Sequence, residues 1–202
     1  LSRVNIKSLI KEVSKLKSDD ELEEKLKRIK NFEDRVFIDN GEAKILDSEK
    51  YYLNEDEFKS EIIRNLFRNS IKHNEGQKID ELRINIKLNI LSYEKISREL
   101  KNNIKKNNSI KQYLEFTYRD NGCGINKNKY EQILKMGDET KSLFKSVTNG
   151  DLSKRGLHNI MHTVYLHEGA CKYYKEKKNI IKGSNETYNE IFKMIIPLRD
   201  KL

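Results

Sequence analysis

The sequence contains few of the residues that divide a chain into separate domains. Its 202 residues include one proline, Pro197, and nine glycines. Glycine and proline mark turns and linkers, so few places are left for long flexible connections. A chain of this length is long enough for one α/β domain with a real core and a small helical extension. We therefore expect one main domain rather than two of independent size.

Cysteine and long apolar runs are also scarce. Cys123 and Cys171 are the only cysteines, too few for the disulfide framework of a small secreted domain. We therefore expect a reducing, cytoplasmic compartment. The sequence contains no apolar run of membrane-spanning length and no signal-peptide pattern. It begins at Leu1 rather than methionine, which leaves open that the chain is part of a longer protein with a membrane anchor.

Charge of one sign is in excess, with 41 Lys and Arg against 32 Asp and Glu and a net charge of +9. A basic excess raises the question of nucleic-acid binding. The lysines are spread along the whole chain between Asn, Ile and Glu residues. No basic run alternates with aromatic side chains, as a base-stacking groove would need. We therefore do not expect nucleic acid as a partner.

The first 34 residues are expected to form a helical arm. A second helix start is predicted at Ser18 or Asp19, which can cap the segment that follows. The arm could pack on the main domain or join two copies of the protein in a homodimer, and the sequence favours neither. Both alternatives rest on apolar residues at helical spacing: Ile6, Leu9, Ile10, Val13 and Leu16, followed by Leu22, Leu26 and Ile29.

Residues 35–202 are expected to form an α/β two-layer sandwich, in which a mixed sheet packs on helices. A polar stretch rich in Asn and Lys, 92–111, is predicted to be a helical or loose insertion. A hairpin is predicted around Asn40-Gly41. Apolar alternation predicts strands at 35–38, 43–46, 83–91, 113–119, 170–176 and 188–196. Helices are predicted at 55–73 (after a cap at Asn54), 129–136 and 156–167.

One of these helices concentrates polar residues on a single face. At about 100° per residue, Glu61, Asn65, Asn69 and Lys72 fall in one narrow sector. An asparagine carbonyl can serve Mg²⁺, which takes hard oxygen ligands and keeps several waters, so that one or two protein oxygens beside phosphate oxygens suffice. Lys72 would then contact a phosphate. The alternative is that both asparagines are solvated on an outer face. The sector beside them should face the sheet: Ile62, Ile63, Leu66, Phe67 and Ser70.

A second feature is the end of the predicted strand at 113–119. Asp120 is followed there by two glycines, Gly122 and Gly124. Glycine permits positive φ and lets a flat ligand approach the backbone closely. An aspartate at this place can accept the amine of adenine. The alternative is an ordinary Asp-Asn-Gly hairpin turn, but Gly124-Ile125 and the helix predicted after it supply no immediate return strand.

A third feature is the place where a polar loop, 137–154, meets a helix. The junction reads Lys154-Arg155-Gly156-Leu157. Free N–H groups at a helix start attract phosphate oxygens, and the helix dipole adds to the attraction. Thr140 and Lys141, at the front of the loop, could add further phosphate contacts.

In this order the three features resemble the nucleotide-binding domain shared by gyrase, the large heat-shock chaperone, histidine kinases and MutL. The resemblance runs from about Asp56 to Leu198. Residues 65–72 look like the asparagine box of that superfamily and 120–125 like its first glycine box. Residues 156–160 resemble the second glycine box, in the form seen in citrate-sensor and quorum-sensor kinases. The end of the chain, 169–198, looks like the final strands of a kinase catalytic domain.

The resemblance implies ATP and Mg²⁺ as cofactors, with Asn69 as the metal ligand and Asn65 and Lys72 as catalytic residues. There are three departures. The polar insertion 92–111 separates two strands that are usually closer together. The second glycine box usually begins with another glycine, where this chain has Lys154. Asn65 stands where the hydrolysing members carry a glutamate base, which favours a kinase-type site because an amide cannot take a proton from water. The residues implied in nucleotide binding are Asn65, Asn69, Lys72, His73, Asp120, Gly122, Gly124, Ile125, Thr140, Lys141, Lys154, Gly156 and Leu157.

The leading hypothesis is therefore the ATP-binding catalytic domain of a sensor histidine kinase in two-component signalling. The four histidines lie within the ATP-binding part and none in the N-terminal helices, so this chain alone is not expected to phosphorylate itself. Its partner would be a phosphoacceptor domain or a response regulator. Two alternatives are a stand-alone ATPase or ATP-dependent switch acting on a partner, and a nucleic-acid clamp of the MutL or gyrase type.

Overall fold

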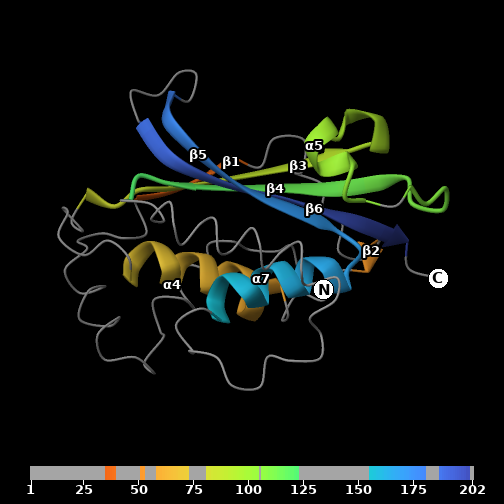
Figure 1. The fold of residues 1–202 in the computed structure, drawn as a ribbon, viewed down its shortest axis with the longest axis horizontal. Coiled ribbons are helices and arrows are strands. Elements are labelled where there is room, and N and C mark those ends of the chain that lie inside the picture. The colour runs from red at the N-terminus through yellow and green to blue at the C-terminus, as the bar shows by residue number, and fades with distance from the viewer. Residues whose placement is uncertain are drawn as a thin grey trace.

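The computed structural model describes residues 35–39, 51–52, 58–72, 81–104, 106–122, 155–180 and 187–200. Several predictions from the sequence lie outside these residues: the arm 1–34, the Asn40-Gly41 turn with its second strand at 43–46, the cap at Asn54, the helix at 129–136 and the loop 137–154. The described part is one mixed sheet with helices on it (Figure 1), which confirms the predicted α/β class. None of its helices has the length and apolar character needed to cross a membrane.

The sheet has the strand order β1-β3-β4-β6-β2, and β5 pairs with β6. β1 runs parallel to β3 with Val36 opposite Ile84, and the other pairings are antiparallel. The short β2 was not predicted, because two tyrosines form no alternating pattern. The strands are β1 (Val36–Asp39), β2 (Tyr51–Tyr52), β3 (Ile84–Leu91), β4 (Gln112–Asp120), β5 (Ala170–Ile180) and β6 (Thr187–Asp200).

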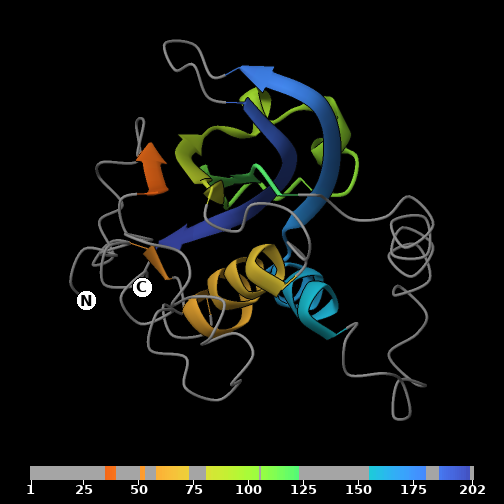
Figure 2. The same cartoon turned by 90° about the vertical axis from the view of Figure 1, so that its left-hand side faces the viewer.

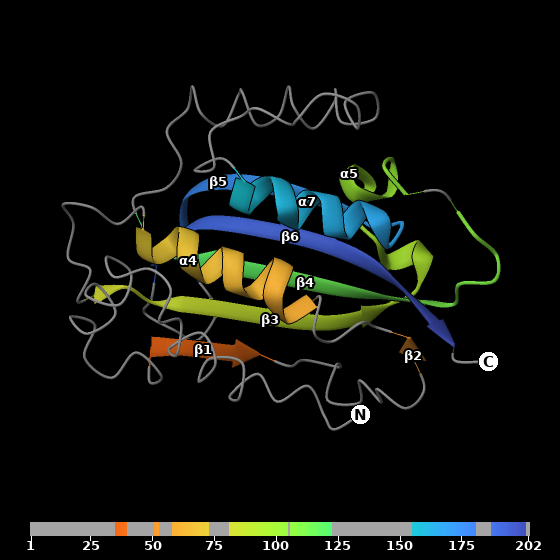
Figure 3. The same ribbon diagram turned by 90° about the horizontal axis from the view of Figure 1, so that it is seen from below.

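Two helices lie side by side on one face of this sheet (Figures 2 and 3). The first begins as a π-helix, Phe58–Ile63, and continues as α4 (Arg64–Lys72). The second is α7 (Arg155–Leu166). The predicted sheet-facing sector of the first helix is confirmed, since Ile62, Ile63, Leu66, Phe67 and Ser70 are all buried.

The main core fills the space between these helices and the sheet. Alternate residues of β3 and β4 enter it, including Ile86 and Phe116. The ring of Phe67 meets the ring of Tyr118 edge-on at 5.8 Å, and Phe58 meets Phe116 in the same way at 5.6 Å. Burying one such aromatic side chain stabilises the fold by about 1.5–3 kcal/mol. The apolar stripe of α4 therefore fixes which sector of the helix is left for polar residues.

The insertion at 92–111 is packed on the opposite face of the sheet. It contains a 3₁₀ turn, η5 (Tyr93–Lys95), and a short helix, α5 (Arg98–Lys101). Leu100 is fully buried there. Glu99 ties the insertion to β5, because it accepts from the Tyr174 hydroxyl at 2.8 Å and pairs with Lys172 at 3.0 Å. Of the two alternatives predicted for this segment, helical or loose, the structure shows short helical turns. A second core forms beneath it: Ile96, Leu100, Ile104, Ile110, Tyr113, Ala170 and Ile195.

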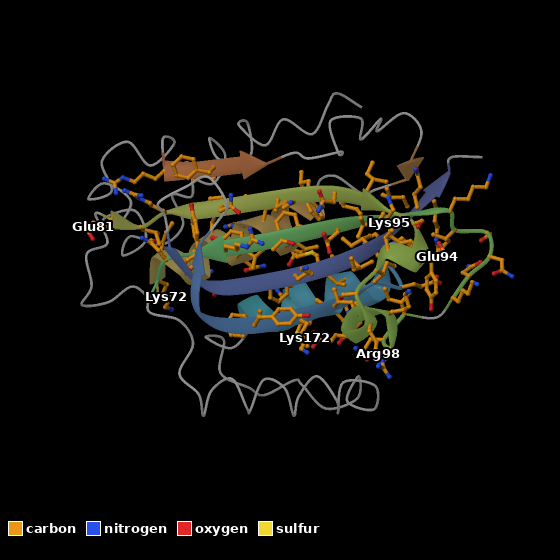
Figure 4. The ribbon with its side chains drawn as sticks, turned by 90° about the horizontal axis from the view of Figure 1, so that it is seen from above. Lys72, Glu81, Glu94, Lys95, Arg98 and Lys172 are labelled. Carbon is orange, nitrogen blue, oxygen red and sulfur yellow. The ribbon has the colours of Figure 1, made fainter. Side chains whose placement is uncertain are left out.

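The rest of that outer face carries polar side chains (Figure 4). Arg119 donates to Asn85 Oδ1 at 3.1 Å across β4 and β3. Glu115 accepts from Asn89 at 2.9 Å and pairs with Lys193 at 3.4 Å. One end of the sheet is thus covered by apolar packing and the other by cross-strand polar contacts.

The chain passes from α7 into β5 through a tight helix end. Glu168 has a φ of 57°, and its N–H bonds to the Tyr165 carbonyl at 2.9 Å. The N–H of Gly169 bonds to the Val164 carbonyl, also at 2.9 Å, so the helix ends in a Schellman motif. A Cβ on Gly169 would lie 2.3 Å from the Ile195 carbonyl oxygen. Only glycine fits this approach of α7 to β6.

Candidate functional site

Asp120 lies at the end of β4, on the face of the sheet that carries the two helices. It is 7% exposed. One carboxylate oxygen accepts from the Gly122 N–H at 2.9 Å and the other from the Ser70 hydroxyl. Burial raises the pKa of the Asp120 carboxyl, and these two hydrogen bonds act against the rise. Asp120 is therefore a buried, oriented acid.

A tyrosine hydroxyl extends this contact. The Tyr118 hydroxyl lies 2.8 Å from Ser70 Oγ. Tyr118, Ser70 and Asp120 thus form a chain of three polar groups between β4 and α4. Ser70 was predicted on the sheet-facing sector of the helix, without a functional role. The available signal was a single hydroxyl residue in an otherwise apolar sector.

The turn after Asp120 is held by Asn121. Its side chain donates to the Glu81 carbonyl at 2.7 Å and accepts from the Arg83 N–H at 2.6 Å. Asp120 itself pairs with Ile84 on β3 and with Glu190 on β6. Because both edges of β4 are occupied at this residue by β3 and β6, no strand directly after the turn could pair there. The ordinary hairpin alternative for this segment is therefore wrong.

The two asparagines of α4 meet the start of α7. A Cβ on Gly156 would lie 3.2 Å from Asn69 Oδ1 and 3.6 Å from Asn65 Oδ1. Glycine at this position lets the helix start lie against both amide groups. The alternative that the asparagines are solvated on an outer face is wrong, because both are half-buried against α7.

The hydrogen bonds of the two amides differ. Asn65 Nδ2 donates to the Glu61 carbonyl oxygen at 2.7 Å. Among the described residues, the Asn69 amide has no hydrogen-bond partner. Its side-chain carbonyl oxygen is a hard, neutral ligand atom of the kind that binds Mg²⁺. The residues present therefore fit a bound magnesium ion at Asn69.

The predicted polar sector continues to Glu61. Its carboxylate accepts from the Asn159 side chain of α7 at 3.3 Å. Glu61, Asn65 and Asn69 thus all face α7, as a continuous polar line between two helices.

The structure brings five of the predicted site residues into two adjacent groups. Asn65, Asn69 and Gly156 form one, and Asp120 and Gly122 the other. Ser70 follows Asn69 directly and joins the groups.

The other predicted site residues are placed less directly. Lys72 ends α4 and is half-buried. Leu157 is partly buried and packs against the main core, so its contact with a nucleotide stays a prediction. Six predicted site residues lie outside the described residues: His73, Gly124, Ile125, Thr140, Lys141 and Lys154.

Comparison with known proteins identifies a family. No curated protein matches the chain. A sequence model of a protein family, described as histidine kinase-, DNA gyrase B-, and HSP90-like ATPase, matches residues 55–200. Domains of this family bind ATP, typically with Mg²⁺. The match covers the polar sector of α4, the Asp120 turn, α7 and the last two strands. The chain therefore belongs to the family of histidine kinase-, DNA gyrase B-, and HSP90-like ATPases.

Proposed function

We propose that the chain is the ATP-binding catalytic domain of a sensor histidine kinase, which binds Mg-ATP for phosphotransfer to a histidine outside this chain. The observation that carries the proposal is Asn65. It stands where hydrolysing members of the family have a glutamate base, and its amide nitrogen is committed to the Glu61 carbonyl at 2.7 Å. A neutral amide cannot take a proton from water. The site therefore favours transfer to a positioned acceptor over rapid hydrolysis.

The two groups of the site would bind different parts of the nucleotide. Asp120 would accept the adenine amine, and Asn69 would be the Mg²⁺ ligand. Lys72 would contact a phosphate, and so would the N–H groups at the start of α7 near Gly156. The bound metal ion would neutralise charge on the phosphates. The residues at 73, 124, 125, 140, 141 and 154 are assigned to the same nucleotide from the sequence alone.

The decisive experiment compares binding, hydrolysis and transfer in one preparation. Calorimetric titration with ADP and ATP, with and without Mg²⁺, is expected to show binding that Mg²⁺ strengthens. With ATP labelled at the γ-phosphate, the label should pass to a phosphoacceptor domain, while hydrolysis without an acceptor stays slow. Absence of ADP binding would refute the nucleotide site. Fast hydrolysis that needs no acceptor would refute the kinase assignment alone.

A second candidate is a stand-alone ATPase or ATP-dependent switch that acts on a partner. Glu61 supports it, because this carboxylate lies one helical turn before Asn65 and is held by Asn159 at 3.3 Å. It could act as a general base through a water molecule. Glu61→Gln should then abolish hydrolysis without weakening ADP binding. Glu94→Gln is the matched control, because Glu94 is exposed on the insertion (Figure 4).

The boundaries and partners belong to the same proposal. Residues 1–34 would be a helical arm that joins two copies, and residues 35–202 the ATP-binding domain. A phosphoacceptor domain or response regulator would be the partner, in the cytoplasm. Sedimentation tests the arm: replacing Leu9 and Leu16 by aspartate should convert a dimer into a monomer with unchanged ADP affinity.

A further inference from the structure

Tyr118 is a buried tyrosine whose hydroxyl points into the Asp120 site. Earlier inward-facing positions of β4 hold Leu114 and Phe116, and Tyr118 is 3% exposed at the next one. Its ring is fixed by edge-on contact with Phe67 at 5.8 Å. Packing would be served equally well by phenylalanine. What tyrosine adds is a hydroxyl 2.8 Å from Ser70 Oγ.

The hydroxyl groups of this chain donate their hydrogen bonds in the direction of Asp120. A serine hydroxyl has one proton and can also accept. Ser70 donates its proton to Asp120 Oδ2, so the Tyr118 hydroxyl is the donor to Ser70. The Gly122 N–H donates to Oδ1 at 2.9 Å. Both carboxylate oxygens thus accept from the protein, and each keeps a lone pair for a ligand.

We propose that Tyr118 is a positioning residue that acts through Ser70. It holds the Ser70 proton toward Asp120 and so keeps Asp120 ionised and ready to accept the exocyclic amine of a purine. The proposal rests on the proposed function, since it concerns the base end of the same nucleotide site. It assigns to Tyr118 a share in the preference for 6-amino over 6-oxo purines. A 6-oxo base would place a carbonyl against an ionised carboxylate, so that neither group could donate.

The surroundings of Asp120 decide how readily its carboxyl is ionised. Burial raises the pKa of the Asp120 carboxyl, and the hydrogen bonds from Ser70 and Gly122 lower it. From β3 the paired residue is the apolar Ile84, and from β6 it is Glu190, an acidic residue. From α4 comes Ser70, with Lys72 at the end of that helix. Chained hydroxyls favour the ionised acid, because the second donor polarises the first.

The test measures the dissociation constants of ADP and of inosine diphosphate between pH 5 and 8, without metal. Tyr118→Phe should weaken ADP about threefold to tenfold at pH 7, the range of one neutral hydrogen bond. It should also reduce the preference for ADP over inosine diphosphate. The pH below which ADP affinity falls should be higher in this variant than in wild type. Ser70→Ala should do the same more strongly. Tyr113→Phe is the matched control, since Tyr113 lies on the same strand but contributes to the second core.

Combining the two substitutions separates positioning from packing. If Tyr118 acts through Ser70, Tyr118→Phe added to Ser70→Ala should bring no further pH shift. Ser70→Thr keeps a hydroxyl, so its pH profile of ADP binding should match that of wild type rather than that of Ser70→Ala. This comparison tests the inference even if Tyr118→Phe fails to fold. A uniform loss of ADP affinity in Tyr118→Phe, with unchanged pH profile and ADP preference, would overturn the inference. Failure of the wild-type protein to bind ADP would instead refute the proposed function.

Discussion

Gly156→Ala tests whether the contact between α4 and α7 serves the ligand or the fold. The added methyl group would lie 3.2 Å from Asn69 Oδ1 and 3.6 Å from Asn65 Oδ1. The first distance is tighter than an ordinary carbon–oxygen contact, so the Asn69 amide must turn away by a few tenths of an ångström. Both atoms are ends of flexible side chains, and the backbone of α4 can stay in place.

The expected result is a separation of stability from binding. Alanine in a helix is favoured over glycine by about 0.5–1 kcal/mol, so the free energy of unfolding should stay constant or rise. The displaced carbonyl oxygen should weaken Mg-ADP about tenfold, or about 1.4 kcal/mol, with a smaller effect on metal-free ADP.

Urea denaturation and calorimetric titration measure the two quantities in the same variant. Asn69→Ala should remove the Mg²⁺ dependence, and Gly156→Ala should cost nothing further in that background. Wild-type Mg-ADP affinity in Gly156→Ala would refute the reasoning, because the close approach would then have no bearing on the metal ligand. A loss of several kcal/mol in unfolding free energy would refute it as well, since the glycine would then be needed for packing.

Three further changes have separate expected outcomes. Asp120→Asn should abolish ADP binding in calorimetry. Because burial raises the folded-state pKa of Asp120, the acid stabilises the fold at low pH and loses that contribution as pH rises through its folded pKa. The variant should therefore unfold at a higher urea concentration than wild type at pH 7, and the difference should be smaller near pH 4. A wild-type urea midpoint at pH 7 would contradict this sign. Gly169→Ala should lower the unfolding free energy by about 1–3 kcal/mol, since its Cβ would meet the Ile195 carbonyl at 2.3 Å; a thermal scan that matches wild type would exclude the clash. Leu100→Ala should cost about 2–5 kcal/mol as a cavity beneath the insertion, whereas a cost near zero would mean that the second core does not support the sheet.

Periodicity in the sequence predicted most of the sheet. The strands at 83–91 and 113–119 match β3 and β4 to within a residue at each end, because alternation along a half-buried strand is a local property. The sheet-facing sector of α4 was predictable for the same reason. β1 was recognised as a strand, but its parallel pairing with β3 joins residues far apart in sequence, which no local pattern encodes.

The polar contacts of the site depended still more on distant residues. Ser70 and Asp120 are 50 positions apart, and Ser70 and Tyr118 are 48 apart. In the sequence, Tyr118 is one more large residue of an alternating strand, and its hydroxyl becomes informative only when α4 is placed over it. The insertion shows the same limit, since four apolar residues among many Asn and Lys gave no sign that they meet Ala170 and Ile195.

The second core has a consequence for how the domain can respond to a ligand. It supports the sheet from behind at Tyr113 and Ile195, the end of β4 opposite to Asp120. Asp120 lies at the other end, where the outer face is covered by contacts such as that of Arg119 with Asn85. Local opening should therefore cost less free energy near Asp120 than near Tyr113. Amide exchange slowed by a bound nucleotide should be concentrated in the Asp120 half, and the half beneath the insertion should exchange alike in both states.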